Sequence, residues 1–187
     1  MTFEAELPQL PGYPLNIDPT ERAMLAMSYG VHVIGSHDGN GDHNAMIADW
    51  VMQVSFKPRL VACSIENDAR TLRYVKATNV FSVNMLHVKD GAAIAKRVVM
   101  PAEGRKIRGR SEAAAAKVHD KLSRLRHEFD ANNCAILLDA LGWYSCEVEQ
   151  FVPVGDHTLV IGRVTHGAVL KDGEMLIERD LGWEYAG

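Results

Sequence analysis

The sequence predicts a mainly β protein, in which short antiparallel strands form a closed or nearly closed barrel with helices on its flank. Segments rich in β-branched and aromatic residues recur about every 10 residues, and clusters of turn-forming residues separate them. One stretch, about residues 90–130, has a helical pattern instead. The chain has 187 residues, 47% of them hydrophobic, which suits one sizeable core. We therefore expect a single domain over 1–187 with one helical insertion.

The N-terminal region predicts an extended arm followed by a short helix. Residues 1–17 carry three prolines, which favour extended backbone. Asp18 can cap a helix, Pro19 suits its first position, and Glu21 can complete a capping box. We expect this helix to end near Met27.

Strands dominate the first half of the chain. Residues 37–42 are dense in turn formers and predict a hairpin, and Lys57-Pro58 interrupts the strand pattern. A short helix is expected over 69–76, after the possible caps Asn67 and Asp68. The strands predicted around these features are 31–36, 44–56, 60–65 and 80–86.

The second half begins with the insertion and returns to strands. Helices are predicted over 90–98 and 111–129, because Ser111 and Glu112 can start the second one and the alanines at 113–116 favour it. The later strands are predicted over 135–138, 143–151, 157–166 and 175–178.

Charge and composition narrow the class of protein. The net charge of −4 argues against a general nucleic-acid binder. Apolar runs are too short for a membrane helix and the N-terminus lacks a targeting pattern, so we expect a cytoplasmic protein. Three cysteines without CxxC spacing predict buried thiols and no disulfide framework. One stretch of the chain is strongly basic and contains Lys96, Arg97, Arg105, Lys106, Arg108 and Arg110. It is either a solvated loop or a site for nucleotide phosphates.

Several common site motifs are incomplete. Residues 104–111 have the glycine spacing of a phosphate loop but Arg110 where that loop needs Lys, and no GxGxxG or GxSxG occurs. The alternation of Asp38, Asn40 and Asp42 lacks the Glu of a calcium loop. His37 and His43 flank the same turn, where a hairpin is favoured over a metal site. We predict no metal.

Two segments favour a cofactor held mainly by backbone. Residues 44–50 include small side chains that let a planar ligand approach the chain. Residues 66–71 lie between a strand end and a helix start, where free N–H groups favour a phosphate and Arg70 and Thr71 add donors. Capping alone is the simpler role for Asn67 and Asp68, and the two roles are compatible.

Together these segments resemble the flavin reductase-like, FMN-binding split-barrel family. The resemblance runs from about Gly30 to Leu86 and again from Leu141 to the C-terminus. The order and spacing of the matching segments are more specific for the family than any one segment alone. The pieces are residues 44–50, Gln53-Val54-Ser55-Phe56-Lys57-Pro58-Arg59-Leu60, Asn67-Asp68-Ala69-Arg70-Thr71-Leu72, Phe81-Ser82-Val83-Asn84-Met85-Leu86 and Gly155-Asp156-His157-Thr158-Leu159-Val160-Ile161-Gly162.

The resemblance implies a Greek-key-like antiparallel split barrel and a set of site residues. Residues 44–50 would lie along the isoalloxazine ring, residues 67–71 would bind the flavin phosphate, and the strand at His157 would close the barrel near the second subunit of a homodimer. Tyr185 would lie near the flavin in an aromatic C-terminal tail. The expected cofactor-binding residues are Asn44, Ala45, Met46, Ile47, Ala48, Asp49, Trp50, Ser64, Glu66, Asn67, Ala69, Arg70, Thr71, Asn84, His157 and Tyr185.

The chain departs from the family pattern at three positions. Ile47 and Asp49 stand where ring-contacting hydroxyl residues are common, and Ala69 replaces a common phosphate-loop serine. Backbone N–H groups can supply the missing contacts. Asp49 either lies near the flavin and lowers its reduction potential, or turns away and pairs with Arg70 or another cation, which we favour.

The implied activity is NAD(P)H-dependent flavin reduction. Hydride would pass from the nicotinamide C4 to flavin N5 with no side-chain nucleophile, so no catalytic residue is assigned. The expected cofactor is FMN, with FAD as the alternative, and the donor is NADH or NADPH. Electrons would go to a flavin-dependent oxygenase, iron or a protein acceptor. The alternatives are a non-enzymatic flavin carrier or sensor, and a split-barrel relative that binds haem or no cofactor.

Overall fold

The computed structural model describes residues 18, 20, 23–24, 26–100 and 120–182. The predicted arm at 1–17, residues 101–119 with most of the basic stretch, and the C-terminal residues 183–187 lie outside them. Thr20 is helical, and its N–H donates to the Asp18 carboxylate (2.8 Å), as expected for the predicted cap.

The first half of the chain is built from strands and one helix. The hairpin at 37–42 is confirmed, because the Asp38 carboxylate accepts the N–H groups of Asn40 and Asp42 inside the turn. The other predicted elements agree to within two residues, with one exception. The strand predicted over 44–56 is interrupted at Asp49 and Trp50. The elements are β1 (His32–His37), β2 (His43–Ala48), β3 (Val51–Ser55), β4 (Leu60–Glu66), α2 (Arg70–Thr78) and β5 (Val80–Met85).

The second half confirms the first helix of the insertion and corrects two predictions. The described end of the helix predicted over 111–129 is wrong, since residues 127–129 form a strand that pairs with β7. The strand predicted over 175–178 is also wrong. The Leu176 carbonyl accepts the Val31 N–H, and the Leu176 N–H donates to the Leu86 carbonyl. The chain therefore crosses the ends of β1 and β5 and forms isolated bridges there in place of a strand. The elements are α3 (Gly91–Val98), β6 (His127–Phe129), β7 (Ala135–Leu137), β8 (Gly142–Val154), β9 (His157–Val169) and the 3-10 helix η2 (Glu178–Leu181).

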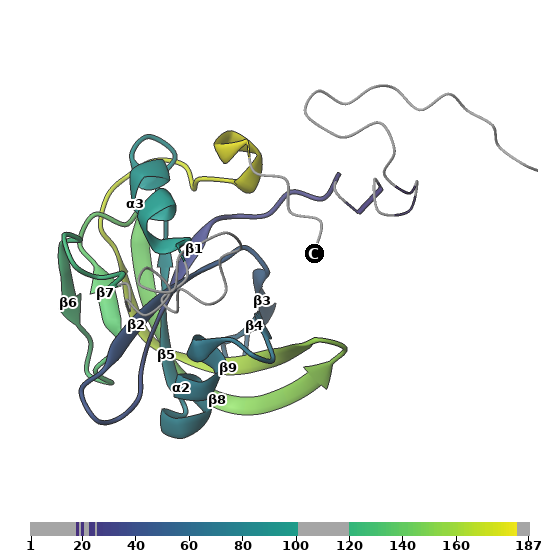
Figure 1. Ribbon diagram of the computed structural model, residues 1–187, viewed down its shortest axis with the longest axis vertical. Helices are drawn as coiled ribbons and strands as arrows, with labels where there is room; N and C mark the ends of the chain where they lie inside the picture. Colours follow the sequence, from purple (N-terminus) through teal and green to yellow (C-terminus); the bar gives the residue numbers. More distant parts are fainter. Residues whose placement is uncertain (1–17, 19, 21–22, 25, 101–119, 183–187) are drawn as a thin grey trace, which may run out of the picture.

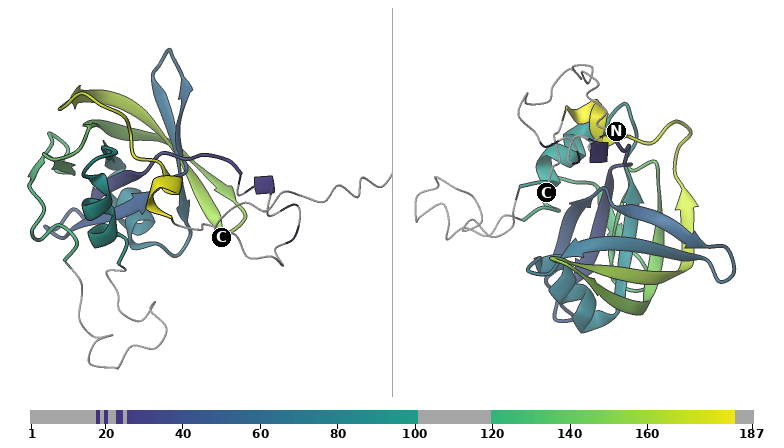
Figure 2. Two further views of the ribbon diagram at one scale, coloured as in Figure 1. Left: turned by 90° about the horizontal axis from the view of Figure 1, so that it is seen from above. Right: turned by 90° about the vertical axis from the view of Figure 1, so that its right-hand side faces the viewer.

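Seven of these strands form one antiparallel sheet in the order β2-β1-β5-β8-β9-β4-β3. Laid flat, its outer strands β2 and β3 would lie roughly 29 Å apart, at about 4.8 Å per strand spacing. Only Asp49 and Trp50 join them, and the chain from Ala48 to Val51 spans at most about 11 Å. The sheet must therefore curl until its two ends approach each other (Figures 1 and 2).

The curled sheet has apolar residues on both of its faces. β1 is buried along its whole length, with Val33 in one hydrophobic cluster and Ile34 in the other. The first cluster includes α3 and β7, and the second includes α2, so the two helices cover opposite ends of the sheet (Figure 1). No helix of the described segments is long and apolar enough to cross a membrane.

The three cysteines are unpaired and buried, as the sequence predicts. Cys63 and Cys146 lie in the second hydrophobic cluster. Burial raises the pKa of the Cys63 thiol to about 12, and burial together with nearby Asp130 does the same for Cys134. Cysteine therefore behaves here as a small apolar residue.

Truncation of Leu86 should test the first core cluster. Leu86 is fully buried, so Leu86→Ala should lower the free energy of unfolding by about 3 kcal/mol through lost burial and a residual cavity. Leu170→Ala is the matched control, because Leu170 is 40% exposed and its loss should cost less than about 1 kcal/mol. Urea unfolding of both variants measures the difference, and equal losses would contradict the assigned core.

Candidate functional site

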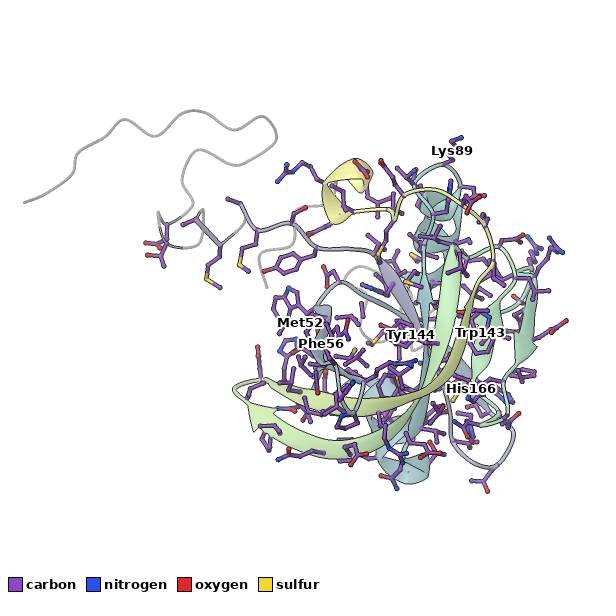
Figure 3. The ribbon with its side chains drawn as sticks, turned by 180° about the vertical axis from the view of Figure 1, so that it is seen from behind. Met52, Phe56, Lys89, Trp143, Tyr144 and His166 are labelled. Carbon is purple, nitrogen blue, oxygen red and sulfur yellow. The ribbon has the colours of Figure 1, made fainter. Side chains whose placement is uncertain are left out.

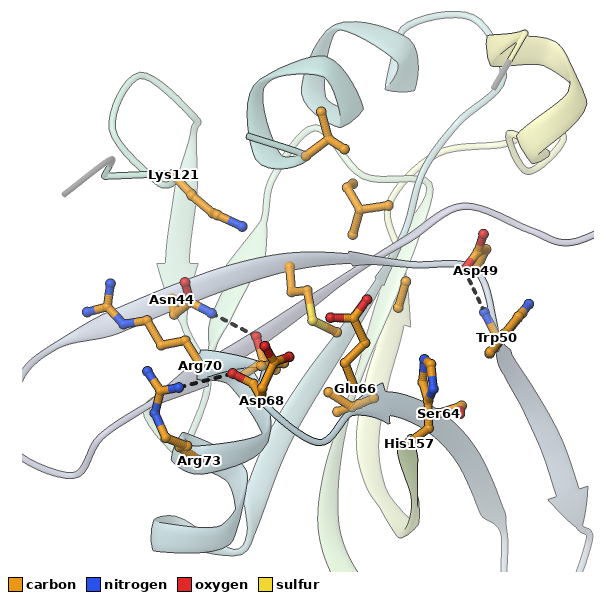
Figure 4. Close-up of a pocket in the computed structure, with 17 residues that line it drawn as sticks. Asn44, Asp49, Trp50, Ser64, Glu66, Asp68, Arg70, Arg73, Lys121 and His157 are labelled. Atoms are coloured by element: carbon orange, nitrogen blue, oxygen red, sulfur yellow. Dashed lines mark hydrogen bonds between the residues drawn. The ribbon is translucent and has the colours of Figure 1, made fainter. Parts of the chain in front are cut away.

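A cavity of about 260 Å³ lies where the two ends of the sheet approach each other (Figure 4). Its walls come from β2, the end of β4, the start of α2 and the start of β9, with Val99 and Lys121 from the second half of the chain. The cavity thus gathers segments that are far apart in sequence, and most of its walls were predicted as cofactor contacts.

One wall is the strand β2. Met46, Ile47 and Ala48 line the cavity, and Ile47 also packs against the first hydrophobic cluster. Asn44 is buried, and its side-chain amide donates to the Thr71 hydroxyl (2.8 Å). This bond ties β2 to the first turn of α2, so the apolar wall and the helix start hold a fixed relation.

The start of α2 presents backbone donors that no side chain caps. Its N-cap residue is Ala69, which has no side-chain hydrogen bond to the helix. The predicted capping by Asn67 or Asp68 is therefore wrong. The Asn67 side chain bonds the Gly155 carbonyl (3.3 Å) and the Thr158 hydroxyl (2.7 Å) instead. The uncapped N–H groups at this helix end, beside the cavity, favour an anion.

Charged side chains of both signs lie around this helix end: Arg70, Arg73 and Lys121 with Glu66 and Asp68 (Figure 4). Arg70 forms an ion pair with Asp42 and donates to the Tyr74 hydroxyl (2.8 Å). Lys121 points into the cavity from the opposite side, and no carboxylate of the described residues pairs with it. Burial lowers the pKa of the Lys121 ammonium to about 8, and the positive charge of the nearby Arg70 makes a smaller contribution in the same direction. An anion between these two cations would relieve their repulsion.

The other end of the cavity carries aromatic rings and a carboxylate. The rings of Trp50 and His157 lie 5.1 Å apart, and His157 bonds Asp156 through Nδ1 (2.6 Å). The Asp49 carboxylate accepts the Trp50 N–H (3.1 Å), and burial raises its pKa above the usual aspartate value. The favoured ion pair between Asp49 and Arg70 is not present, because the Arg70 guanidinium is paired with Asp42 instead.

The structure brings most of the predicted site residues together. Ala45 is instead fully buried in the first hydrophobic cluster. Asn84 is also fully buried, where its amide bonds the Val33 and Ala135 carbonyls and the Leu137 N–H, which joins β1, β5 and β7. Tyr185 lies outside the described residues. The predicted residues that line the cavity are Asn44, Met46, Ile47, Ala48, Asp49, Trp50, Ser64, Glu66, Ala69, Arg70, Thr71 and His157.

Five lining residues were not predicted. Asp68 and Arg73 could have been found, because Asp68 lies in the predicted loop and Arg73 follows Arg70 by one helical turn. Ile65 lies within the predicted strand that ends beside the loop. Val99 and Lys121 have no local signal, since only the fold brings the second half of the chain to this cavity.

The arrangement suits a ligand with an anionic end and an uncharged end. The anion would meet the start of α2 with Arg70 and Lys121, and a planar body would lie along β2 toward Trp50. Within the part of the chain that the structure describes, no group of three or more His, Cys, Asp or Glu side chains is placed to hold a metal ion.

Comparison with known proteins agrees with this geometry. A family model described as "Flavin reductase like domain" matches residues 24–181. Diflavin flavoprotein A 1 of Synechocystis sp. is 26% identical over 151 residues, which cover 81% of this chain and 24% of that protein. A Rhizobium meliloti protein named "Probable flavin reductase" is 24% identical over 143 residues, which cover 76% of this chain and 40% of that protein. The chain therefore spans about a quarter to two fifths of these relatives.

A solved structure is also similar. The flavin reductase PheA2 in its native state superimposes with a TM-score of 0.67 at 28% identity, over 86% of this chain and 93% of that chain. The predicted mainly antiparallel β fold is confirmed by the strand pairing and by this likeness.

Replacement of Asp49 should change how stability depends on pH. A carboxyl group whose pKa is raised by folding is destabilising once ionised, so its cost appears as the pH rises above about 4 and persists above the folded pKa. Asp49→Asn keeps an acceptor for the Trp50 N–H and removes that cost. Its free energy of unfolding should exceed that of the unmodified chain at pH 7 and approach it near pH 4. Urea unfolding across this range measures the difference, and a gain that shrinks as the pH rises would contradict the burial of Asp49.

Proposed function

Because this chain belongs to the flavin reductase-like domain family, we propose that it binds FMN in the cavity at the start of α2 and reduces it with NADH or NADPH. The reduced flavin, or its electrons, would pass to an acceptor such as a flavin-dependent oxygenase.

The uncapped start of α2 carries this proposal. Its backbone donors face the same cavity as Arg70 and Lys121, which is the combination that binds a phosphate monoester. The opposite part of the cavity is a strand with apolar and small side chains, Met46, Ile47 and Ala48, which a flat ring can approach. The phosphate and ring system of FMN match these two parts.

The chain's own residues would supply position and field. When bound, the flavin supplies hydride acceptance at N5 from the nicotinamide C4. Trp50 and His157 border the cavity end farther from Lys121, where their rings can limit the position of a second planar group (Figure 4). A partly buried carboxylate at Asp49 in the same region would oppose added negative charge, so it would lower the flavin reduction potential when ionised.

Visible spectroscopy tests the proposal directly. Purified protein titrated with FMN should shift the flavin band near 450 nm, and anaerobic NADH or NADPH should then bleach it. Bound flavin that neither donor reduces would favour a carrier or sensor and contradict the reductase. The absence of any spectral shift on FMN addition would contradict flavin binding itself.

Lys121 offers a variant for the phosphate contact. Lys121→Met should weaken FMN binding about tenfold, because it removes a charged donor that no described carboxylate holds in place. Riboflavin, which lacks the phosphate, is the matched control ligand and should bind the variant and the unmodified chain equally. Equal losses for both ligands would place the phosphate elsewhere.

We also propose a homodimer, for which the outer strand β3 offers a surface. β3 pairs with β4 and is an end strand of the sheet as described. Met52 is 64% exposed and Phe56 is 83% exposed on and beside this strand (Figure 3). Large apolar side chains exposed together on a surface favour contact with a second chain.

Sedimentation velocity tests this surface. Phe56→Ser should shift the protein from dimer to monomer at micromolar concentration, because it removes the most exposed large apolar side chain of this edge. Val169→Ser, at the far end of β9 from His157, is the control and should leave the dimer intact although Val169 is 74% exposed. Dissociation by Val169→Ser alone would assign the dimer to another face.

A further inference from the structure

Lys121 is held inside a cavity without a carboxylate partner. Its side chain points into the cavity at the start of α2 from the opposite wall, and it also lines an adjoining cavity of about 510 Å³ (Figure 4). Among the described residues, no carboxylate forms an ion pair with it. The Lys171 ammonium, in contrast, pairs with Asp90 (2.7 Å). Lys121 therefore differs from an ordinary surface lysine.

Hydrogen bonds fix the backbone on both sides of Lys121. One Asp120 carboxylate oxygen accepts the N–H groups of Leu122 and Ser123 (3.0 Å each), and Leu122 is buried in the first hydrophobic cluster. The Arg97 guanidinium donates to the Asp120 carbonyl (3.3 Å) and to the Ser123 hydroxyl. These contacts restrict the main chain at Lys121 and direct its side chain toward the cavity.

We propose that Lys121 is an acylation site, where its amine accepts the acyl group of an acyl phosphate. The inference rests on the proposed function, because the phosphate of the donor would bind where we place the flavin phosphate. The amine nitrogen attacks the acyl carbon and forms a C–N bond. The bond between that carbon and the bridging oxygen breaks, inorganic phosphate leaves with the electron pair, and the amine loses a proton to water.

The surroundings of Lys121 favour the neutral amine, which is the nucleophilic form. Burial is the main cause of its lowered pKa of about 8, and the charge of Arg70, the first residue of α2, adds to it. At pH 8 about half of the Lys121 side chains are therefore neutral, compared with about 0.4% of exposed lysines. A lysine desolvated beside another cation is an activated nucleophile. A lower pKa also makes each neutral group less nucleophilic, as it does for thiolates, so we expect a net advantage of about tenfold.

Acylation would change the charge of the flavin site. The amide product carries no positive charge and is no longer a charged donor. The adjoining cavity, which Lys121 also lines, has room for an acyl group of a few carbons. Acylation would therefore weaken the binding of a phosphate at the start of α2 and leave the contacts of a planar ring along β2 intact. It would lower the affinity for FMN and spare riboflavin.

Site-resolved mass spectrometry of the full chain treated with acetyl phosphate at pH 8 tests the inference. Lys121 should be acetylated at least about tenfold faster than Lys89, which is exposed (Figure 3). Saturating inorganic phosphate or FMN should slow the reaction at Lys121 and leave Lys89 unchanged. N-hydroxysuccinimidyl acetate, an acyl donor without phosphate, is the control reagent and should show a smaller preference for Lys121.

Flavin titration links the modification to the flavin site. Acetylation of Lys121 should raise the Kd for FMN about tenfold and the Kd for riboflavin less than about twofold. Lys121→Gln, which is neutral like acetyl-lysine, should reproduce this pattern without treatment, and its retained riboflavin binding would show that it folds. Lys121→Arg has no primary amine, so acetyl phosphate should change its FMN affinity less than about twofold.

The outcomes separate this inference from the proposed function. Equal acetylation of Lys121 and Lys89 by both reagents, in a chain that binds FMN, would overturn the acylation site and leave the flavin site intact. A preference for Lys121 that neither inorganic phosphate nor FMN reduces would overturn the step directed by the donor's phosphate. Preferential, phosphate-sensitive acetylation of Lys121 in a chain that binds no flavin would support the acylation site and contradict the proposed function.

Discussion

The short link between β2 and β3 is the constraint on which the rest of the structure depends. Asp49 and Trp50 join strands at opposite ends of the sheet, so the sheet has to curl around its own core. The link is held in place because the Ser64 N–H donates to the Trp50 carbonyl (3.0 Å). The cavity lies at the seam that this link closes. Its walls come from both ends of the sheet, and the bond from Asn44 to Thr71 joins β2 to the start of α2.

The two ends of the cavity differ in the charge of their side chains. Arg70 at the start of α2 is neutralised by Asp42, whereas Lys121 has no carboxylate partner among the residues that the structure describes. Near Trp50, at the other end, lie the His157 imidazole and the Asp49 carboxylate, and burial holds the Asp49 carboxyl closer to its neutral form. A ligand with one anionic end therefore has one favourable orientation. Its binding would also relieve the repulsion between Arg70 and Lys121, so the protein and ligand stabilise the same arrangement.

Local patterns predicted the strands, α2, and most of the cavity walls, because alternation and turn residues act over a few positions. They failed where distant contacts decide the structure. The alanines at 113–116 favour helix, yet residues 127–129 pair with β7 as a strand. Asn84 lies in a segment that resembles the family, but its amide joins three strands within the core. Tertiary structure places Lys121 at the cavity, so the sequence around it does not predict that role. The cofactor prediction depended on the family resemblance, since spacing alone left phosphate binding and capping equally open at Asn67 and Asp68.

The burial of the cysteines has a consequence for chemical durability. Reduced flavins react with oxygen to give peroxide, which attacks thiolates far faster than thiols. Because burial keeps the Cys63 and Cys134 sulfurs protonated and away from solvent, they present little of the reactive form. Under the proposed flavin reduction, peroxide formed at the cavity would meet few thiolates at Cys63 and Cys134, so these side chains would resist sulfenic acid formation.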